Sequence, residues 1–250
     1  MRVLSSVPVR DAVILAAGNG DRFKNSHLHS KLLHPVLGQP LILRTLETAA
    51  EAGLSALSVV LGYQADRVRA VIEAHPIPGT TIRFTYNPEW PLENGVSALK
   101  ARDICTSRRF ALLMGDHLFE PSVLRRLASL HTAAGDCLLA VDGSVVDPGV
   151  ADEATKVQLE GDRIVRIGKA LERWDALDTG LFVFTPAIFT ALAESCREGQ
   201  TTLSAGVQRL AATRVMRGVP TGGASWFDVD TIDDLQVAES MLATMDSETA

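Results

Sequence analysis

Short apolar runs alternate along this chain with stretches in which hydrophobic residues recur every three or four positions. The runs predict buried strands, and the wider spacing predicts amphipathic helices. Strands are expected at about 12–17, 56–61, 81–86, 109–117 and 137–141. Helices are expected at about 40–53, 66–74, 94–103, 121–131, 186–195 and 201–213, with a last one that runs to about 243. This alternation predicts an α/β fold: a mostly parallel, twisted, Rossmann-like sheet with right-handed crossovers and helices on both faces.

The second half of the chain adds a different pattern. Residues 155–159 and 163–167 alternate apolar and polar positions, and residues 160–162 (E-G-D) join them, which predicts a β-hairpin. No Pro/Gly/Ser-rich linker, repeat or low-complexity segment divides the chain. Residues 1–250 are therefore expected to form one domain, with residues 1–10 as a poorly ordered lead-in.

The composition narrows the class of partner. Hydrophobic residues make up 46% of the chain, enough for a large core, and the net charge is −6 with a pI of about 5.5. That balance argues against nucleic acid as the main partner. No run of eighteen apolar residues exists, so no membrane span is expected, and Arg10 and Asp11 interrupt any signal peptide. Three isolated cysteines suit a cytoplasmic protein and form no CxxC metal site.

A glycine-rich loop follows the first predicted strand. Residues 15–23 read L-A-A-G-N-G-D-R-F, and small side chains there let backbone N–H groups approach a polyphosphate, while Arg22 and Lys31 add positive charge. Phe23 stands where a dinucleotide fingerprint needs a third Gly or Ala, and no Gly-Lys-Ser/Thr follows for a P-loop. The pattern favours a phosphate-binding loop of another kind, and an ordinary strand-to-helix turn is the alternative.

Carboxylates stand at the ends of two later segments. Asp116 comes just after an apolar run, at the carboxyl end of a predicted strand, where open α/β sheets bind ligands. Asp228 and Asp230 are expected on one side of an extended segment. Three such carboxylates suit Mg²⁺ that bridges phosphate oxygens. The alternatives are that Asp116 caps a turn and that residues 228–231 form a helix N-cap with acidic first-turn residues. His117 is expected to form a hydrogen bond that orients Asp116.

The stretch of residues 86–99 combines a turn with a helix start. Asn94 is expected to be the N-cap of a helix that runs to about Asp103. A helix N-terminus after a turn that contains glycine is a good place for a base edge or an anion. The alternative is a capped helix with Trp90 packed on the core.

Taken together, these motifs resemble the sugar-phosphate nucleotidyltransferase superfamily. The loop is similar to its L-A-A-G-x-G-x-R-[FLM]…K-P signature, with Leu32 in the place of the proline. Residues 86–99 resemble the N-P-x-[YWF]…N-x-x-S-[LA] segment of its cytidylyltransferase branch. Further motifs match this branch, and its CTP:inositol-1-phosphate enzymes most closely: M-G-D-H at 114–117, E-A-T-K at 153–156, D-T-G-x-F-V at 178–183 and W-x-D-V-D-T-x-x-D at 226–234.

The resemblance implies a GT-A-like nucleotidyltransferase fold, in which residues 11–135 mainly bind the nucleotide and residues 136–250 mainly bind the acceptor, beneath the hairpin. It implies transfer of CMP from CTP to a small phosphorylated polyol, with inositol 1-phosphate favoured, pyrophosphate released and Mg²⁺ as cofactor. Phosphocholine, a phosphonate alcohol or a sugar 1-phosphate stay open as acceptors, and UTP stays open as the nucleotide. A non-catalytic nucleotide-binding module is the remote alternative, and a homodimer is left open.

The resemblance also assigns individual residues to four groups. The catalytic group is Arg22, Lys31 and Asp116. The nucleotide-binding group is Leu15, Ala16, Ala17, Gly18, Asn19, Gly20, Asn94, Gly95 and Ser97. The acceptor-binding group is Lys156, Asp178 and Gly180. The metal-binding group is Asp116, Asp228 and Asp230.

Overall fold

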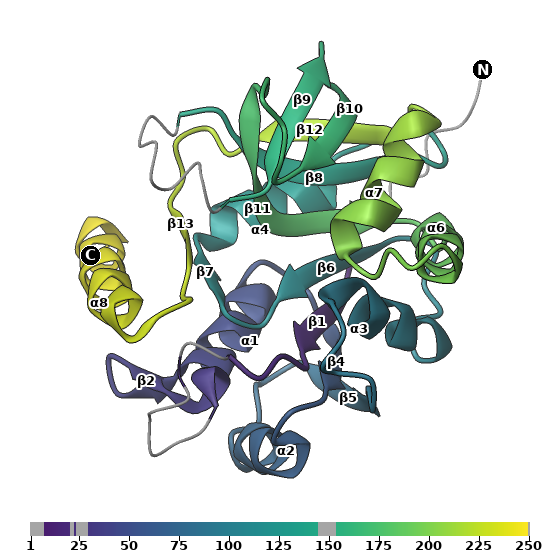
Figure 1. The fold of residues 1–250 in the computed structure, drawn as a ribbon. Helices are drawn as coiled ribbons and strands as arrows, with labels where there is room; N and C mark the ends of the chain where they lie inside the picture. The colour runs from purple at the N-terminus through teal and green to yellow at the C-terminus, as the bar shows by residue number, and fades with distance from the viewer. Residues whose placement is uncertain (1–7, 21–22, 24–29, 145–153, 250) are drawn as a thin grey trace.

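The structure is a computed structural model, which describes residues 8–20, 23, 30–144 and 154–249 (Figure 1). Within the described part of the chain, nine strands form one sheet in the order β5-β4-β1-β6-β11-β8-β12-β10-β9. These strands are β1 (Asp11–Ala16), β4 (Ala56–Leu61), β5 (Thr81–Tyr86), β6 (Phe110–Met114), β8 (Cys137–Asp142), β9 (Lys156–Glu160), β10 (Arg163–Gly168), β11 (Ala176–Phe184) and β12 (Met216–Pro220).

The first half of the sheet is parallel, as the alternation of strands and helices predicts. β1 pairs in parallel with β4 on one side and β6 on the other, and β4 pairs in parallel with β5. Successive side chains of β1 face opposite sides, so Ala12 and Ile14 enter one core cluster while Val13 and Leu15 enter another. Burial on both faces explains why β1 reads as a continuous apolar run rather than an alternating one.

Helices cover both faces of the sheet, and this prediction is confirmed. In Figure 1, α3, α6 and α7 lie on one face and α1 and α4 on the other, and the two core clusters contain residues of these same helices. The helices are α1 (Leu41–Glu51), α2 (Ala65–Ala74), α3 (Asn94–Lys100), α4 (Pro121–Ser129), α6 (Ala187–Arg197), α7 (Leu203–Ala212) and α8 (Ile232–Thr249), with short 3-10 helices η2 (Lys31–Leu33) and η3 (Ala101–Asp103).

The second half of the sheet is mixed, so the prediction of a mostly parallel sheet fits the first half only. β11 runs antiparallel to both β6 and β8, whereas β8 and β12 are parallel. The predicted hairpin forms as β9 and β10, which pair antiparallel around a turn where Gly161 has φ +62°. β11 also carries a bulge between Asp178 and Phe182, and Gly180 within it has φ +75°. Glycine tolerates this left-handed conformation, which most residues avoid.

Two short ribbons were not predicted. β7 (His117–Phe119) pairs antiparallel with β13 (Trp226–Asp228), and β2 (Pro35–Val36) pairs with β3 (Gln39–Pro40). A third core cluster lies between them and α8; its buried members are Phe23, Val36, Leu41, Leu118, Val229 and Ala238. This cluster fixes the C-terminal segment against the rest of the molecule.

Two boundary predictions were wrong. Asn94 is the first residue of α3 and not its N-cap, which is Glu93, because the Asn94 side chain hydrogen-bonds elsewhere in the fold. The last helix extends to Thr249, beyond the predicted end near residue 243, since no glycine or proline interrupts it there. None of the helices in the described ranges combines the length and the apolar character needed to cross a bilayer.

Candidate active site

A pocket opens at the carboxyl ends of the central parallel strands, where such sheets bind ligands. It has a volume of about 350 Å³. The residues that line it are Leu15, Ala16, Gly18, Asn19, Gly20, Lys31, Leu32, Asp116 and Asp230. The structure thus brings most of the predicted glycine loop together with the predicted lysine and two of the predicted carboxylates. Arg22 lies outside the described residues.

Gly20 lines this pocket next to Lys31. Its φ is +59°, and a Cβ atom added there would lie 2.7 Å from the Cβ of Lys31. A side chain at this position would therefore collide with the stem of the lysine. Gly18 has open space where its Cβ would be. The two glycines consequently differ in role, because only Gly20 is required for the packing of Lys31.

Lys31 is the central cation of the described site. It is only 8% exposed, and its Nζ atom lies 2.6 Å from Asp116 Oδ2 and 2.9 Å from Asp230 Oδ1. Burial alone lowers the pKa of Lys31, but the three carboxylates of Asp116, Asp228 and Asp230 outweigh it and raise the pKa above its usual value. Burial raises the pKa of Asp116, and the Lys31 charge overcomes this and holds it below its usual value. Both groups are therefore charged at neutral pH.

The turn that carries Asp116 is held by a buried threonine. Thr45 of α1 places its Oγ1 atom 3.1 Å from the carbonyl oxygens of both Gly115 and His117. The Gly115 N–H donates to the carbonyl of Leu15 at 2.9 Å, which ties the turn to β1. Thr45 was not predicted to take part in the site, although a lone hydroxyl in the buried stripe of α1 is a signal that could have indicated it.

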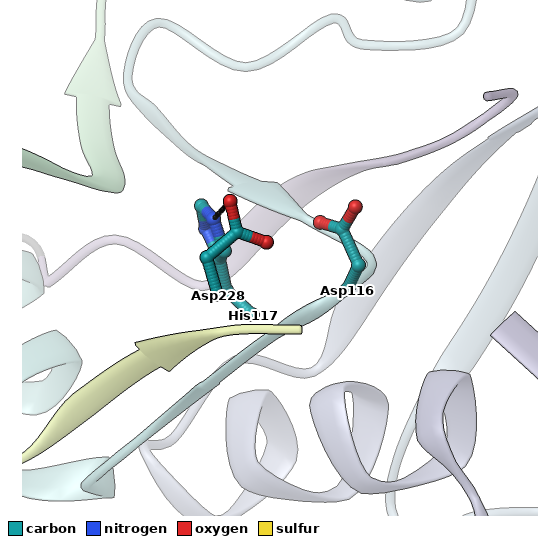
Figure 2. Close-up of side chains that lie close together, drawn as sticks. All are labelled: Asp116, His117 and Asp228. Carbon is teal, nitrogen blue, oxygen red and sulfur yellow. Dashed lines mark ion pairs between the residues drawn. The ribbon is translucent and has the colours of Figure 1, made fainter. Parts of the chain in front are cut away.

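Asp116, His117 and Asp228 form a cluster suited to a divalent cation. One ligand atom from each lies within 4.8 Å of the others, and Figure 2 shows the two carboxylates side by side and directed into the same space. Among the described residues, the buried Oδ1 atom of Asp228 has no hydrogen-bond partner, as expected of an atom reserved for a ligand. Carboxylate oxygens are the ligands that Mg²⁺ prefers, so the residues present fit such an ion.

His117 contacts a different carboxylate from the one predicted. Its Nε2 atom lies 3.3 Å from Asp228 Oδ2, and no hydrogen bond joins its side chain to Asp116 in the part of the chain that the structure describes. Burial lowers the pKa of His117, but the Asp228 charge and hydrogen bond outweigh it and raise the pKa to about 9. The role of orienting Asp116 falls instead to the turn that Thr45 holds.

Asp228 and Asp230 have separate partners, although the sequence predicts that they act on one face. Asp228 ends β13 and contacts His117, whereas Asp230 pairs with Lys31. Asp230 also donates its backbone N–H to Asp234 Oδ2 at 2.9 Å, as part of the N-terminal capping of α8. The structure thus brings Asp228, rather than Asp230, to the candidate metal cluster.

The three predicted nucleotide residues of α3 make internal contacts. Asn94 Oδ1 accepts a hydrogen bond from the Leu203 N–H at 2.8 Å, and Ser97 Oγ accepts one from Asn87 Nδ2 at 3.0 Å. A Cβ on Gly95 would lie 2.5 Å from the carbonyl oxygen of Thr201, so this glycine permits close packing. None of the three lines the pocket beside Lys31. Their role at the nucleotide stays a prediction.

The predicted acceptor residues lie along neighbouring strands. Lys156 pairs with Leu177 in the β9–β11 register, and Leu177 is the residue that precedes Asp178. The Nζ atom of Lys156 donates to the Lys169 carbonyl at 3.2 Å. Asp178 Oδ1 accepts the Gly180 N–H at 2.8 Å. Burial raises the pKa of Asp178 to about 6, and the Gly180 N–H and the His117 charge only partly oppose this. Asp178 is thus a carboxylate within β11 whose pKa is perturbed and which lies near His117 of the metal cluster.

Comparison with known proteins places the chain in a family. Residues 12–161 match the model of the MobA-like NTP transferase domain. The chain is 36% identical over 236 residues to a bifunctional IPC transferase and DIPP synthase of Rubrobacter xylanophilus, and the alignment covers 92% of this chain and 51% of that protein. The chain therefore spans about half the length of the curated relatives it matches.

Solved structures agree with this placement. The inositol-1-phosphate CTP transferase from T. maritima superposes with a TM-score of 0.81 at 26% identity, covering 95% of this chain and 96% of that one. An apo UDP-glucose pyrophosphorylase, at 16% identity and a TM-score of 0.77 over 95% of this chain and 99% of that chain, shares the fold. With the family match extending over more than half of its residues, this chain belongs to the MobA-like NTP transferase family.

Proposed function

We propose that the chain transfers CMP from CTP to the phosphate of a small polyol, with inositol 1-phosphate as the preferred acceptor and pyrophosphate as the leaving group. The observation that carries the proposal is the pocket in which Lys31 and two strand-end carboxylates meet the glycine loop. The likeness to the T. maritima inositol-1-phosphate CTP transferase supports this choice of nucleotide and acceptor.

The proposed chemistry needs no covalent nucleophile. A phosphate monoester is close to dianionic at neutral pH, so one of its oxygens attacks the α-phosphorus of CTP in line as pyrophosphate leaves. The protein holds the two substrates in that geometry and balances their negative charge. The glycine loop supplies backbone N–H groups to the triphosphate, and Arg22 and Lys31 supply positive charge.

Asp116 and Asp228 would hold the divalent cation, which we propose to be Mg²⁺. When bound, the ion offsets the charge of the triphosphate and of the transition state. Asp230 keeps Lys31 at the edge of the same site. Because Lys31 is buried and surrounded by carboxylates, its charge acts in a site that is poorly screened by water, where electrostatic stabilisation is strongest.

We propose that Asp178 and Lys156 read the acceptor. A polyol ring offers hydroxyl groups that can donate to the carboxylate of Asp178, whereas a trimethylammonium group offers none. A site built to hydrogen-bond hydroxyls rejects analogues that lack them, because its buried polar groups are left unpaired. Lys156 lies in a neighbouring strand and would meet the acceptor phosphate.

Steady-state release of pyrophosphate from CTP with a panel of acceptors tests this function. We expect kcat/KM for inositol 1-phosphate to exceed the values for phosphocholine, a phosphonate alcohol and glucose 1-phosphate. Asp178→Asn should lower turnover with the polyol while CTP still binds. A higher kcat/KM for phosphocholine would contradict the acceptor part of the proposal, and no pyrophosphate release with any acceptor would contradict the reaction itself.

A further inference from the structure

β11, which carries Asp178 and Gly180, lies against the metal cluster at His117. His117 begins β7 and lies directly opposite Asp228 in the antiparallel β7–β13 ribbon. Residues opposite each other in such a pair project to the same face, so the register alone brings the two side chains together. The 3.3 Å contact between His117 Nε2 and Asp228 Oδ2 is the result.

On its other side, the His117 ring rests against the bulge of β11. A Cβ atom on Gly180 would lie 2.3 Å from His117 Nδ1 and 2.4 Å from His117 Cε1. No side chain larger than hydrogen fits there unless the ring moves. Gly180 also holds φ +75° and donates its N–H to Asp178 Oδ1, which fixes the bulge under the ring. The His117 ring is therefore held between Gly180 of β11 and the carboxylate of Asp228.

The position of the His117 ring fixes the orientation of the Asp228 carboxylate. The Oδ2 atom of Asp228 faces His117, and its buried Oδ1 atom has no partner among the described residues. A carboxylate held by one oxygen presents the other in a fixed direction, which is how hydrogen-bonded partners commonly orient metal ligands. The donor in this case comes from an element that itself borders the acceptor site.

We propose that His117 is a positioning residue that orients Asp228 toward the divalent cation, and that Gly180 serves to seat the His117 ring. This inference rests on the metal site of the proposed function, because it takes Asp116 and Asp228 as the metal ligands, and it does not depend on the acceptor. It moves Gly180 from the predicted acceptor-binding group to the support of the metal site. It also makes the bulge of β11 the physical link between acceptor binding and metal binding.

Measuring Mn²⁺ binding to the purified protein tests the inference without turnover. Binding is followed by electron paramagnetic resonance, with and without a CTP analogue in which methylene replaces the α,β-bridging oxygen. His117→Gln keeps a donor that can reach Asp228, and His117→Ala removes it. We expect His117→Ala to weaken Mn²⁺ binding by about 10- to 100-fold, the usual effect of losing such a partner, and His117→Gln to recover most of the affinity. Equal affinities for these two variants, or wild-type affinity for His117→Ala, would overturn the proposal.

Gly180→Ala provides the second arm. It should weaken Mn²⁺ binding in the wild-type background and add little in the His117→Ala background, where the ring is gone. Gly161→Ala is the matched control, since Gly161 also has positive φ but has open space where a Cβ would lie. If Gly180→Ala raises only KM for the acceptor and leaves Mn²⁺ affinity unchanged, the seating role is wrong.

Two further readouts distinguish this inference from direct coordination by His117 and from the proposed function. Pulsed resonance of bound Mn²⁺ should show no directly coordinated nitrogen; a coordinated nitrogen would make His117 a ligand and overturn the positioning role. Wild-type protein that binds Mn²⁺ and gives the expected variant pattern, yet forms no CDP-inositol, would refute the proposed function and leave this inference standing. Wild-type protein that does not bind Mn²⁺ even with the CTP analogue would overturn the inference.

Discussion

Asp178→Asn should make the protein more stable and less active. Burial raises the pKa of Asp178 to about 6, from an ordinary value of 3.8, so the folded protein disfavours the ionised form by roughly two pKa units. At about 1.4 kcal/mol per unit this is about 3 kcal/mol, and partial exposure of the side chain reduces it to about 2 kcal/mol. Asparagine keeps an oxygen that can accept the Gly180 N–H and carries no charge.

The pH dependence follows from the direction of the shift. Between about pH 4 and pH 6 the folded protein retains a proton on Asp178 that the unfolded chain has already released. The contribution of Asp178 to the free energy of unfolding therefore falls as pH rises through that window. Above about pH 6 the full destabilisation by the buried charge is present. Asp178→Asn removes the cost, so the variant should exceed the wild type in stability at pH 8 and match it at pH 4.

Thermal unfolding of both proteins at pH 4 and pH 8 measures this difference. For a domain of this size, each kcal/mol of added stability raises the thermal unfolding midpoint by about 2–4 °C. We therefore expect a midpoint about 4–8 °C higher for Asp178→Asn at pH 8. Turnover with inositol 1-phosphate should fall in the same variant, since the acceptor hydroxyls lose their carboxylate. A variant that is no more stable than wild type at pH 8, or whose advantage is equally large at pH 4, would refute the reasoning.

Three further predictions concern the pocket. Lys31→Ala should lower kcat by about 100- to 1,000-fold, the effect of losing one charge-stabilising donor, and Lys31→Arg should not restore it, because a planar fork does not replace a compact ammonium; wild-type turnover by Lys31→Ala would contradict its catalytic role. Asp116→Asn and Asp228→Asn should each abolish metal-dependent pyrophosphate release while circular dichroism stays unchanged, and full activity of the wild type in EDTA would contradict the metal assignment. Thr45→Val should cost about 1–3 kcal/mol in urea unfolding, because the carbonyls that Thr45 contacts lose their donor; an unchanged midpoint would show that the turn is held without it.

The elements that the sequence predicts well are those whose signal is local. The burial of β1 on both faces follows from its continuous apolar run, and the glycine loop that lines the pocket follows from a motif of a few residues. Asp116 was found because it stands at the end of an apolar run, where the topology of an α/β sheet places ligands. In each case one short segment carries both the pattern and its consequence.

The features that were not predicted depend on partners far apart in the sequence. β7 and β13 are three residues each, too short for a period to show, and their pairing decides that His117 contacts Asp228. Asn94 accepts from Leu203, which lies 109 positions away, so no local rule for N-caps could find this bond. Likewise, no local pattern in the residues of β11 indicates that this strand runs antiparallel to β6.

The most direct test of the proposed function is a competition in one reaction. Equal concentrations of CTP and UTP are offered together with equal inositol 1-phosphate, phosphocholine and glucose 1-phosphate in the presence of Mg²⁺, and the products are identified by mass spectrometry. The structure-based proposal predicts CDP-inositol as the main product, formed by the wild type and not by Asp116→Asn. UDP-glucose or CDP-choline as the main product would contradict it.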